Sequence, residues 1–194
     1  MKVVVYNKNE MNKSPQKQNQ RIIIFDGPDM CGKTEMSLEL SRRLEIPYFK
    51  NEGEWDFFEN DPGYFANCVK YGATFLCSFL KQVGSSVIMD RGHHSEWVYS
   101  QIFQRATDQK LLKRVDNAFA EMGAVLIVPY RSTYHGLVDQ FDAITPKKLQ
   151  EIDEKYKKIK DWTACDVFYL NVDDENLDRE MSDILKYLHT KEMF

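Results

Sequence analysis

A short segment of this 194-residue chain combines two glycines, a lysine and a threonine in a spacing that suits phosphate binding. The segment GPDMCGKT, residues 27–34, matches the pattern G-x-x-x-x-G-K-[ST]. Glycines let the backbone curl so that successive N–H groups point at phosphate oxygens, and a following helix adds its N-terminal dipole. Lys33 would place a positive charge on the β- and γ-phosphates, and the Thr34 hydroxyl would ligate Mg²⁺. We therefore predict an ATP phosphate cradle made of Gly27, Pro28, Asp29, Met30, Cys31, Gly32, Lys33 and Thr34.

A second pair of charged residues ends another apolar run, Val87-Ile88-Met89-Asp90-Arg91. In open α/β sheets, ligands bind at the carboxyl ends of the strands, where the strand order reverses. We therefore expect Asp90 to contact Mg²⁺ through water and Arg91 to point into the same crevice.

The elements that would hold these residues alternate between strands and helices. Strand patterns occur at Arg21–Asp26, Pro47–Lys50, Ser86–Asp90, Ala124–Pro129 and Asp166–Val172. Helical patterns cover residues 33–45, 62–83, 94–121, 146–162 and 175–189, and Thr145-Pro146 is a helix start signal. This alternation implies βαβ units and a parallel sheet covered on both faces. We predict one three-layer α/β P-loop domain with a five-stranded parallel sheet over residues 21–194, after a flexible polar arm, residues 1–20.

Composition limits the class of protein. The chain is 43% hydrophobic and 29% charged, as ordinary globular proteins are, and its net charge of −4 argues weakly against duplex binding. The cysteines form no C-x-x-C pair, which favours reduced thiols over a disulfide or zinc framework. No apolar run approaches the roughly 20 residues of a membrane span, and no secretory signal is visible. We expect a cytoplasmic protein without a membrane partner. The four cysteines are Cys31, Cys68, Cys77 and Cys165.

Two motifs resemble those of thymidylate kinases. FDGPDMCGKT resembles their F-E-G-x-D-G-x-G-K-T loop, and DRGHHSEWVYSQ resembles their D-R-x-x-x-S-x-x-A-Y-Q segment. Asn51-Glu52-Gly53 follows the second strand where that family has R-E-P-G. The resemblance runs from about residue 21 to the end of the chain, and deoxynucleoside kinases share the same general fold. The matched positions of the second motif are Asp90, Arg91, Ser95, Tyr99 and, displaced by one place, Gln101.

The resemblance implies roles for individual residues. Asp29 matches a carboxylate that contacts the sugar of the acceptor nucleotide, and Arg91 matches an arginine that holds the acceptor phosphate. Lys70 stands where the family has a second phosphate-binding arginine, so it keeps the charge but loses the bidentate fork. Of the family's arginine-rich lid this chain retains Arg131, and Gln140 stands where an arginine is common.

These residues predict γ-phosphoryl transfer from ATP, with Mg²⁺, to a deoxynucleoside monophosphate that is thymidylate-like, with pyrimidines favoured. A monophosphate is already an anion, so its attack needs no strong general base. The predicted catalytic residues are Lys33, Asp90, Arg91 and Arg131, with Mg²⁺ at Thr34 and Asp90. The predicted acceptor-binding residues are Asp29, Glu52, Trp55, Lys70, Arg91, Ser95 and Tyr99, of which Trp55 would either stack on a base or line a loop.

Three alternatives stay open at the level of sequence. A deoxynucleoside kinase would use Glu52 as the base for a 5′-hydroxyl. A kinase acting on a modified base or an end in DNA would need a basic, open groove, which the composition does not indicate. A degenerate nucleotide-binding protein could serve as a regulatory module. Small-molecule nucleotides are the expected partners, nucleic acid is disfavoured, and a homodimer is left open.

Two adjacent histidines, His93 and His94, follow Arg91. They could touch an acceptor group, but the sequence places no third ligand at a spacing typical of a metal site. We therefore expect a solvated or helix-capping role for both.

Overall fold

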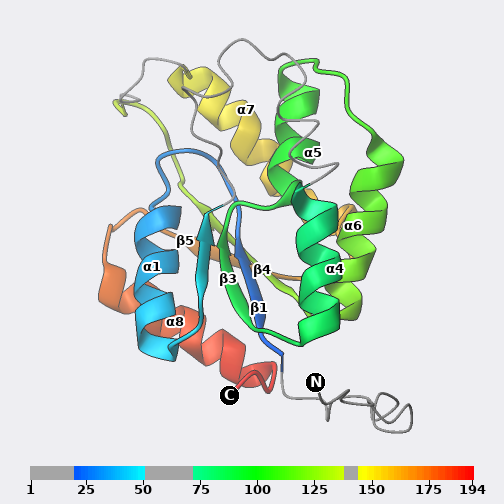
Figure 1. Ribbon diagram of the computed structural model, residues 1–194. Coiled ribbons are helices and arrows are strands. Elements are labelled where there is room, and N and C mark those ends of the chain that lie inside the picture. The colour runs from blue at the N-terminus through cyan, green and yellow to red at the C-terminus, as the bar shows by residue number, and fades with distance from the viewer. Residues whose placement is uncertain (1–19, 51–71, 138–143) are drawn as a thin grey trace, which may run out of the picture.

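Five parallel strands form the centre of the computed structural model, which describes residues 20–50, 72–137 and 144–194 (Figure 1). The strand order is β2-β3-β1-β4-β5, and every neighbouring pair is parallel. The order reverses beside β1, so the crevice at the carboxyl ends of β1 and β3 is where a ligand is expected. The strands are β1 (Ile22–Phe25), β2 (Tyr48–Lys50), β3 (Val87–Asp90), β4 (Val125–Tyr130) and β5 (Asp166–Asn171).

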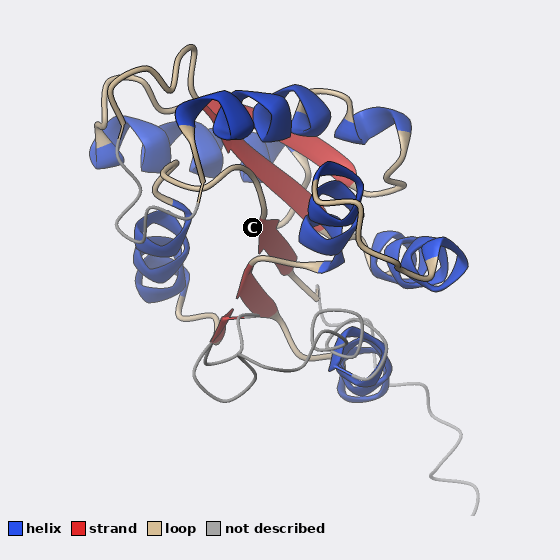
Figure 2. Ribbon diagram, turned by 90° about the horizontal axis from the view of Figure 1, so that it is seen from above, coloured by secondary structure: helices blue, strands red, loops and turns tan. Residues whose placement is uncertain are grey.

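Helices cover both faces of the sheet (Figure 2). In Figure 1, α1 and α8 lie on one face, and α4, α5 and α6 lie on the other. α7 packs its Ile152 and Tyr156 into the same apolar cluster as α4, α5 and α6. The helices are α1 (Lys33–Leu44), α4 (Thr74–Val83), α5 (His93–Ile102), α6 (Gln109–Glu121), α7 (Pro146–Tyr156) and α8 (Leu177–Thr190).

The alternation of side chains along β1 explains the two layers of core. Ile22 and Ile24 pack into the cluster of α4, α5, α6 and α7, whereas Ile23 and Phe25 pack into the cluster of α1 and α8. All four side chains are fully buried. A strand covered on both faces needs an unbroken apolar run, and this strand has one. The predicted three-layer fold with a five-stranded parallel sheet is confirmed.

Two predicted helices differ from the structure. The single helix expected over 94–121 is wrong: α5 ends at Ile102, and α6 begins after Asp108. The Asp108 side chain accepts a hydrogen bond from the Leu111 backbone N–H at 3.0 Å, which makes it an N-cap. The helix expected over 146–162 ends at Tyr156 and is followed by a short 3₁₀ turn, Ile159–Asp161.

The predicted start of α7 is confirmed. Thr145 accepts a hydrogen bond from the Lys148 backbone N–H at 3.3 Å, and Pro146 occupies the first turn. The predicted arm lies, up to residue 19, outside the described residues, as does the first part of the helix expected over 62–83. Within the described ranges, no helix combines the length and apolar character needed to span a membrane.

Candidate active site

The predicted phosphate cradle is the turn between β1 and α1. A Cβ at Gly27 would lie 2.9 Å from the carbonyl oxygen of Pro129, so only glycine fits this close approach to β4. Gly32 has φ 66°, in the left-handed region that favours glycine. The two glycines of the motif therefore have separate tasks: the first allows close packing on the sheet, and the second turns the chain into the helix.

Lys33 lies inside this curl. Its side chain is 6% exposed, and its Nζ donates a hydrogen bond to the Pro28 carbonyl oxygen at 2.5 Å. Burial, followed by the positive charge of Arg91, lowers the pKa of Lys33. The ammonium is thus held by the loop itself, at the place where phosphate oxygens would enter.

The two predicted Mg²⁺ ligands are adjacent in the structure. The hydroxyl of the exposed Thr34 donates a hydrogen bond to Oδ2 of the buried Asp90 at 2.6 Å. Tyr48 donates to the same oxygen at 3.1 Å. A hydroxyl and a carboxylate oxygen at the mouth of a phosphate loop fit Mg²⁺, which prefers hard oxygen ligands and retains several waters.

Asp29, Arg91 and Tyr99 form a second polar group at this edge. Arg91 forms an ion pair with Asp29, and Tyr99 donates to Asp29 Oδ2 at 2.7 Å. Burial acts to raise the pKa of Asp29, but the charges of Arg91 and Lys33 outweigh it, so this pKa is lowered. Arg91 itself has φ 67°, and its backbone N–H donates to the Phe25 carbonyl oxygen at 2.8 Å. The pairing of β1 with β3 therefore fixes the position of the Arg91 backbone, from which its side chain extends.

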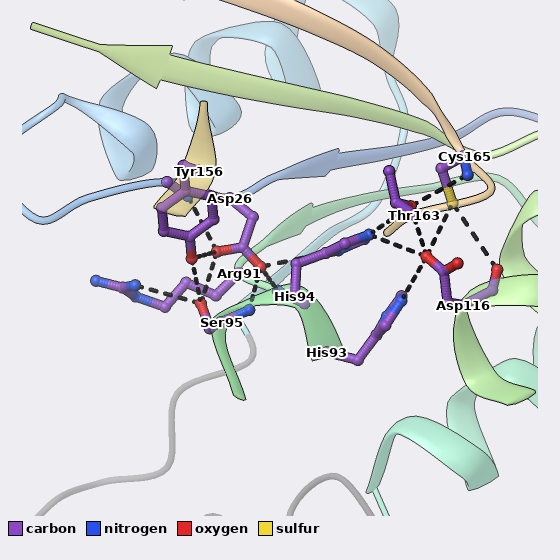
Figure 3. Close-up of polar contacts among 11 residues, drawn as sticks. Asp26, Arg91, His93, His94, Ser95, Asp116, Tyr156, Thr163 and Cys165 are labelled. Carbon is purple, nitrogen blue, oxygen red and sulfur yellow. Dashed lines mark hydrogen bonds and ion pairs between the residues drawn. The ribbon is translucent and has the colours of Figure 1, made fainter. Parts of the chain in front are cut away.

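Asp26 is a site residue that the sequence prediction missed. Its Oδ1 accepts from the Gly27 N–H at 3.0 Å, the Ser95 hydroxyl at 2.6 Å and the Tyr156 hydroxyl at 2.7 Å. Its Oδ2 accepts from the Gly92 and Ser95 backbone N–H groups, both at 2.9 Å (Figure 3). Asp26 thus joins the phosphate loop to the segment that carries Arg91. A signal for Asp26 was present in the sequence, because Asp26 is the last residue of the predicted strand Arg21–Asp26, just as Asp90 is the last residue of Ser86–Asp90.

Solved structures of other proteins share this fold, although no protein-family model matches the chain and no curated protein matches its sequence. The YorR protein of Bacillus subtilis, solved in complex with phosphorylated GDP, has a TM-score of 0.65 and 18% identity, over 88% of this chain and 97% of that one. Thymidylate kinase of Candida albicans has a TM-score of 0.58 and 13% identity, over 90% of this chain and 93% of its own. Deoxyadenosine kinase of M. mycoides with bound dATP has a TM-score of 0.56 and 18% identity, over 88% and 100% of the two chains.

The chain has the fold of thymidylate and deoxynucleoside kinases. The resemblance that the two motifs indicated is therefore confirmed at the level of the fold. In this fold the predicted phosphate loop, Asp90 and Arg91 all lie at the carboxyl edge of the central strands.

Of the other predicted site residues, Ser95 and Arg131 lie in the described part of the chain. Ser95 lies next to Arg91, with its Oγ 3.4 Å from Nη1, but it donates its hydroxyl hydrogen to Asp26. Arg131 donates from Nε to the Met30 carbonyl oxygen at 2.9 Å and from Nη2 to Glu175 at 2.8 Å. Arg131 therefore supports the phosphate loop directly. Outside the described residues lie Glu52, Trp55, Lys70 and Gln140.

A hollow of about 330 Å³ lies beside the phosphate loop. Gly32 and Arg131 line it from one side, and Val172 and Glu175 line it from the segment that follows β5. It has both a cation and carboxylates on its walls, so it suits a polar ligand group.

The expected role of His93 and His94 is wrong. Neither is solvated, because both side chains are at most 1% exposed, and Gly92, not a histidine, occupies the N-cap of α5. Both rings are directed toward Asp116 and away from the guanidinium of Arg91 (Figure 3). Their Nε2 atoms lie 3.2 Å and 3.3 Å from Asp116 Oδ1. The packing of α5 on α6 brings these residues together, and no short sequence spacing could show it.

Proposed function

We propose that the protein transfers the γ-phosphoryl group of ATP to a nucleotide, with a deoxynucleoside monophosphate of the thymidylate type as the acceptor. The observation that carries this proposal is the placement of two cations, Lys33 and Arg91, close to Asp29 at one edge of the sheet. One cation lies in the phosphate loop and the other lies at the end of the neighbouring strand. Such a pair can hold a donor phosphate and an acceptor phosphate within reach of each other.

On the donor side, the loop amides and Lys33 would stabilise the charge on the transferred group. Thr34 and Asp90 would hold Mg²⁺, which when bound neutralises charge on the β- and γ-phosphates. Arg131 would keep the loop in shape through the Met30 carbonyl oxygen. The hollow beside Gly32 is the natural place for the ribose and base of the donor.

On the acceptor side, Arg91 would bind the acceptor phosphate through its planar fork of N–H donors. A nucleoside acceptor would need a base for its hydroxyl, and the described carboxylates suit this role poorly. The pKa of Asp29 is lowered, so this carboxylate is a weak base. Asp26 already accepts five hydrogen bonds. An acceptor that is already an anion removes the need for a base. The preference for deoxypyrimidines rests on the resemblance of the phosphate loop to that of thymidylate kinases.

A phosphoryl-transfer screen tests the proposal. The purified full chain is incubated with ATP and Mg²⁺ and with nucleosides, nucleoside monophosphates or DNA, and each product is identified by mass. We expect diphosphates to form from thymidylate or a related deoxypyrimidine monophosphate. Monophosphates formed from nucleosides would favour a deoxynucleoside kinase with Glu52 as base. Activity on DNA alone, or no transfer with intact ATP binding, would contradict the proposal.

A further inference from the structure

Four side chains with metal-ligand chemistry meet behind the active-site edge, at a place that the proposed reaction does not use. His93 and His94 come from the first turn of α5, and Asp116 comes from α6. Cys165 comes from the turn just before β5. All four are buried, although they belong to three separate segments of the chain. Two imidazoles, a carboxylate and a thiol are the groups that zinc proteins use.

The distances among the two imidazoles and the carboxylate suit a small cation, and the Cys165 thiol lies beside the carboxylate. Asp116 Oδ1 lies 3.2 Å from His93 Nε2, 3.3 Å from His94 Nε2 and 3.9 Å from Cys165 Sγ. The ligand atoms of both histidines and Asp116 lie within 4.8 Å of one another. Two ligands bound to one tetrahedral Zn²⁺ at about 2.0–2.1 Å are roughly 3.3 Å apart. The contacts of Asp116 with the imidazoles are therefore close to those of a formed site.

The hydrogen bonds around Asp116 Oδ1 support the same conclusion. A carboxylate oxygen has about two lone pairs. Here one oxygen faces both imidazole Nε2 atoms and also accepts the Thr163 hydroxyl at 2.5 Å. His94 Nε2 also lies 3.2 Å from the Thr163 hydroxyl oxygen, so two imidazole nitrogens and Oδ1 crowd one buried place. A cation there would be bound by the Nε2 lone pairs and Oδ1 together.

Second contacts already orient the carboxylate. Asp116 Oδ2 accepts from the Ala164 backbone N–H at 2.7 Å and from Lys113 Nζ at 3.0 Å. These bonds leave Oδ1 turned toward the histidines. On the other side, His94 Nδ1 lies 3.9 Å from Asp26 Oδ2. This distance is too long for a hydrogen bond, so the cluster lies beside Asp26, the residue that joins the phosphate loop to the Arg91 segment, without being bonded to it.

We propose that His93, His94, Asp116 and Cys165 form a site for a transition-metal ion, with Zn²⁺ as the ion that fits the donor set best. Imidazole and thiolate ligands select Zn²⁺ over Mg²⁺, so this site is chemically distinct from the one at Thr34 and Asp90. The carboxylate and a Cys165 thiolate together balance the two positive charges of the ion, which limits the cost of burying it. Its role is structural: the ion holds α5, and with it Arg91, against α6 and the turn before β5.

The site is buried, so the ion would enter as the chain folds. The full chain is therefore stripped of metal in denaturant with a chelator and refolded with Zn²⁺ or Co²⁺. Excess Mg²⁺ is present throughout to occupy sites for hard cations. We expect one tightly held Zn²⁺ per chain after gel filtration and a higher midpoint of thermal unfolding than for the metal-free protein. The Co²⁺ form should show the visible bands of a tetrahedral ion and a thiolate-to-cobalt charge-transfer band.

Two cysteine variants test the assignment of ligands. Cys165 and Cys77 are both 7% exposed, but Cys165 is the one whose Sγ lies 3.9 Å from Asp116 Oδ1. Cys165→Ser should lose the charge-transfer band, whereas Cys77→Ser should keep it. His93→Gln should weaken Zn²⁺ binding by at least about 100-fold. A refolded wild-type chain without stoichiometric Zn²⁺ would overturn the proposal even if the histidine variant fails to fold. A charge-transfer band that persists in Cys165→Ser would overturn it as well.

Discussion

Arg91 forms an ion pair with Asp29 of the phosphate loop, and the Tyr99 hydroxyl donates a hydrogen bond to the same carboxylate at 2.7 Å. In the proposed reaction the cation that receives the acceptor phosphate is therefore already held, and its position is set before the substrate arrives. An acceptor phosphate must share or replace this partner. Because the arginine does not have to be ordered on binding, the pairing reduces the entropic cost of gripping the acceptor.

Removal of the Arg91 guanidinium should impair use of the acceptor but not binding of ATP. We expect Arg91→Ala to lower kcat/KM for the acceptor by at least about 30-fold, the loss of a buried charged contact, while the dissociation constant of ATP stays near that of the wild type. Arg43→Ala is the matched control, because Arg43 pairs only at the surface of α1 and α8. Steady-state kinetics and ATP titration measure both effects. An equal loss of ATP affinity would place Arg91 in the donor site instead.

Lys33 should matter for the reaction more than for the fold. Lys33→Ala is expected to reduce turnover by at least about 10²–10³, the loss that follows removal of a preorganised charge contact. Circular dichroism should show an unchanged fold, because Lys33 bonds within the loop and not to the core. Lys81→Ala removes a lysine from a surface pair with Glu121 and should leave turnover unchanged. Turnover like that of the wild type in Lys33→Ala would remove this residue from the mechanism.

Gly32 and Gly84 offer a matched pair of backbone positions. Their φ angles are 66° and 67°, and a Cβ at either would meet no atom closer than 3.8 Å. Alanine should therefore cost each position about 1–2 kcal/mol of unfolding free energy through backbone strain alone. Only Gly32→Ala should also weaken ATP binding, because relief of the strain at φ 66° would turn the residue 32 N–H away from the predicted cradle. Denaturant unfolding and ATP titration test both statements, and equal ATP affinity in the two variants would refute the assignment of the loop.

Much of this arrangement could be predicted from the sequence, because local patterns determine it. The run Ile22–Phe25 is apolar on every residue, which indicates a strand covered on both faces. The proximity of Asp90 and Thr34 could be predicted from the sequence, because the carboxyl ends of parallel strands meet at one edge of the sheet.

The rest depends on contacts between segments that are distant in the chain. The hydrogen bond between Asp26 and Tyr156 joins residues 130 positions apart. The contact of His93 with Asp116 exists only because the chain reverses between α5 and α6 at Asp108. The single helix expected from the sequence over 94–121 would keep the two residues far apart. The N-cap residue Asp108 is the local signal that separates the two helices and so allows this contact.

Asp26 should be a larger determinant of stability than any single donor around it. Asp26→Asn replaces one acceptor oxygen by an NH₂ group that faces N–H or O–H donors, so we expect a loss of about 1–3 kcal/mol in the free energy of unfolding. Tyr156→Phe removes one donor and should cost about 1 kcal/mol. Urea unfolding followed by fluorescence measures both changes. An Asp26→Asn chain as stable as the wild type would show that this carboxylate does not hold the loop and the Arg91 segment together.

The proposed preference for a phosphorylated acceptor is tested by one ratio. With ATP and Mg²⁺ saturating, kcat/KM is measured for thymidylate and for thymidine with the wild-type chain. We expect kcat/KM to be at least about tenfold higher for thymidylate, because Arg91 then forms a charge-assisted contact that the nucleoside cannot form. Thymidine used as well as thymidylate, or better, would refute a monophosphate acceptor.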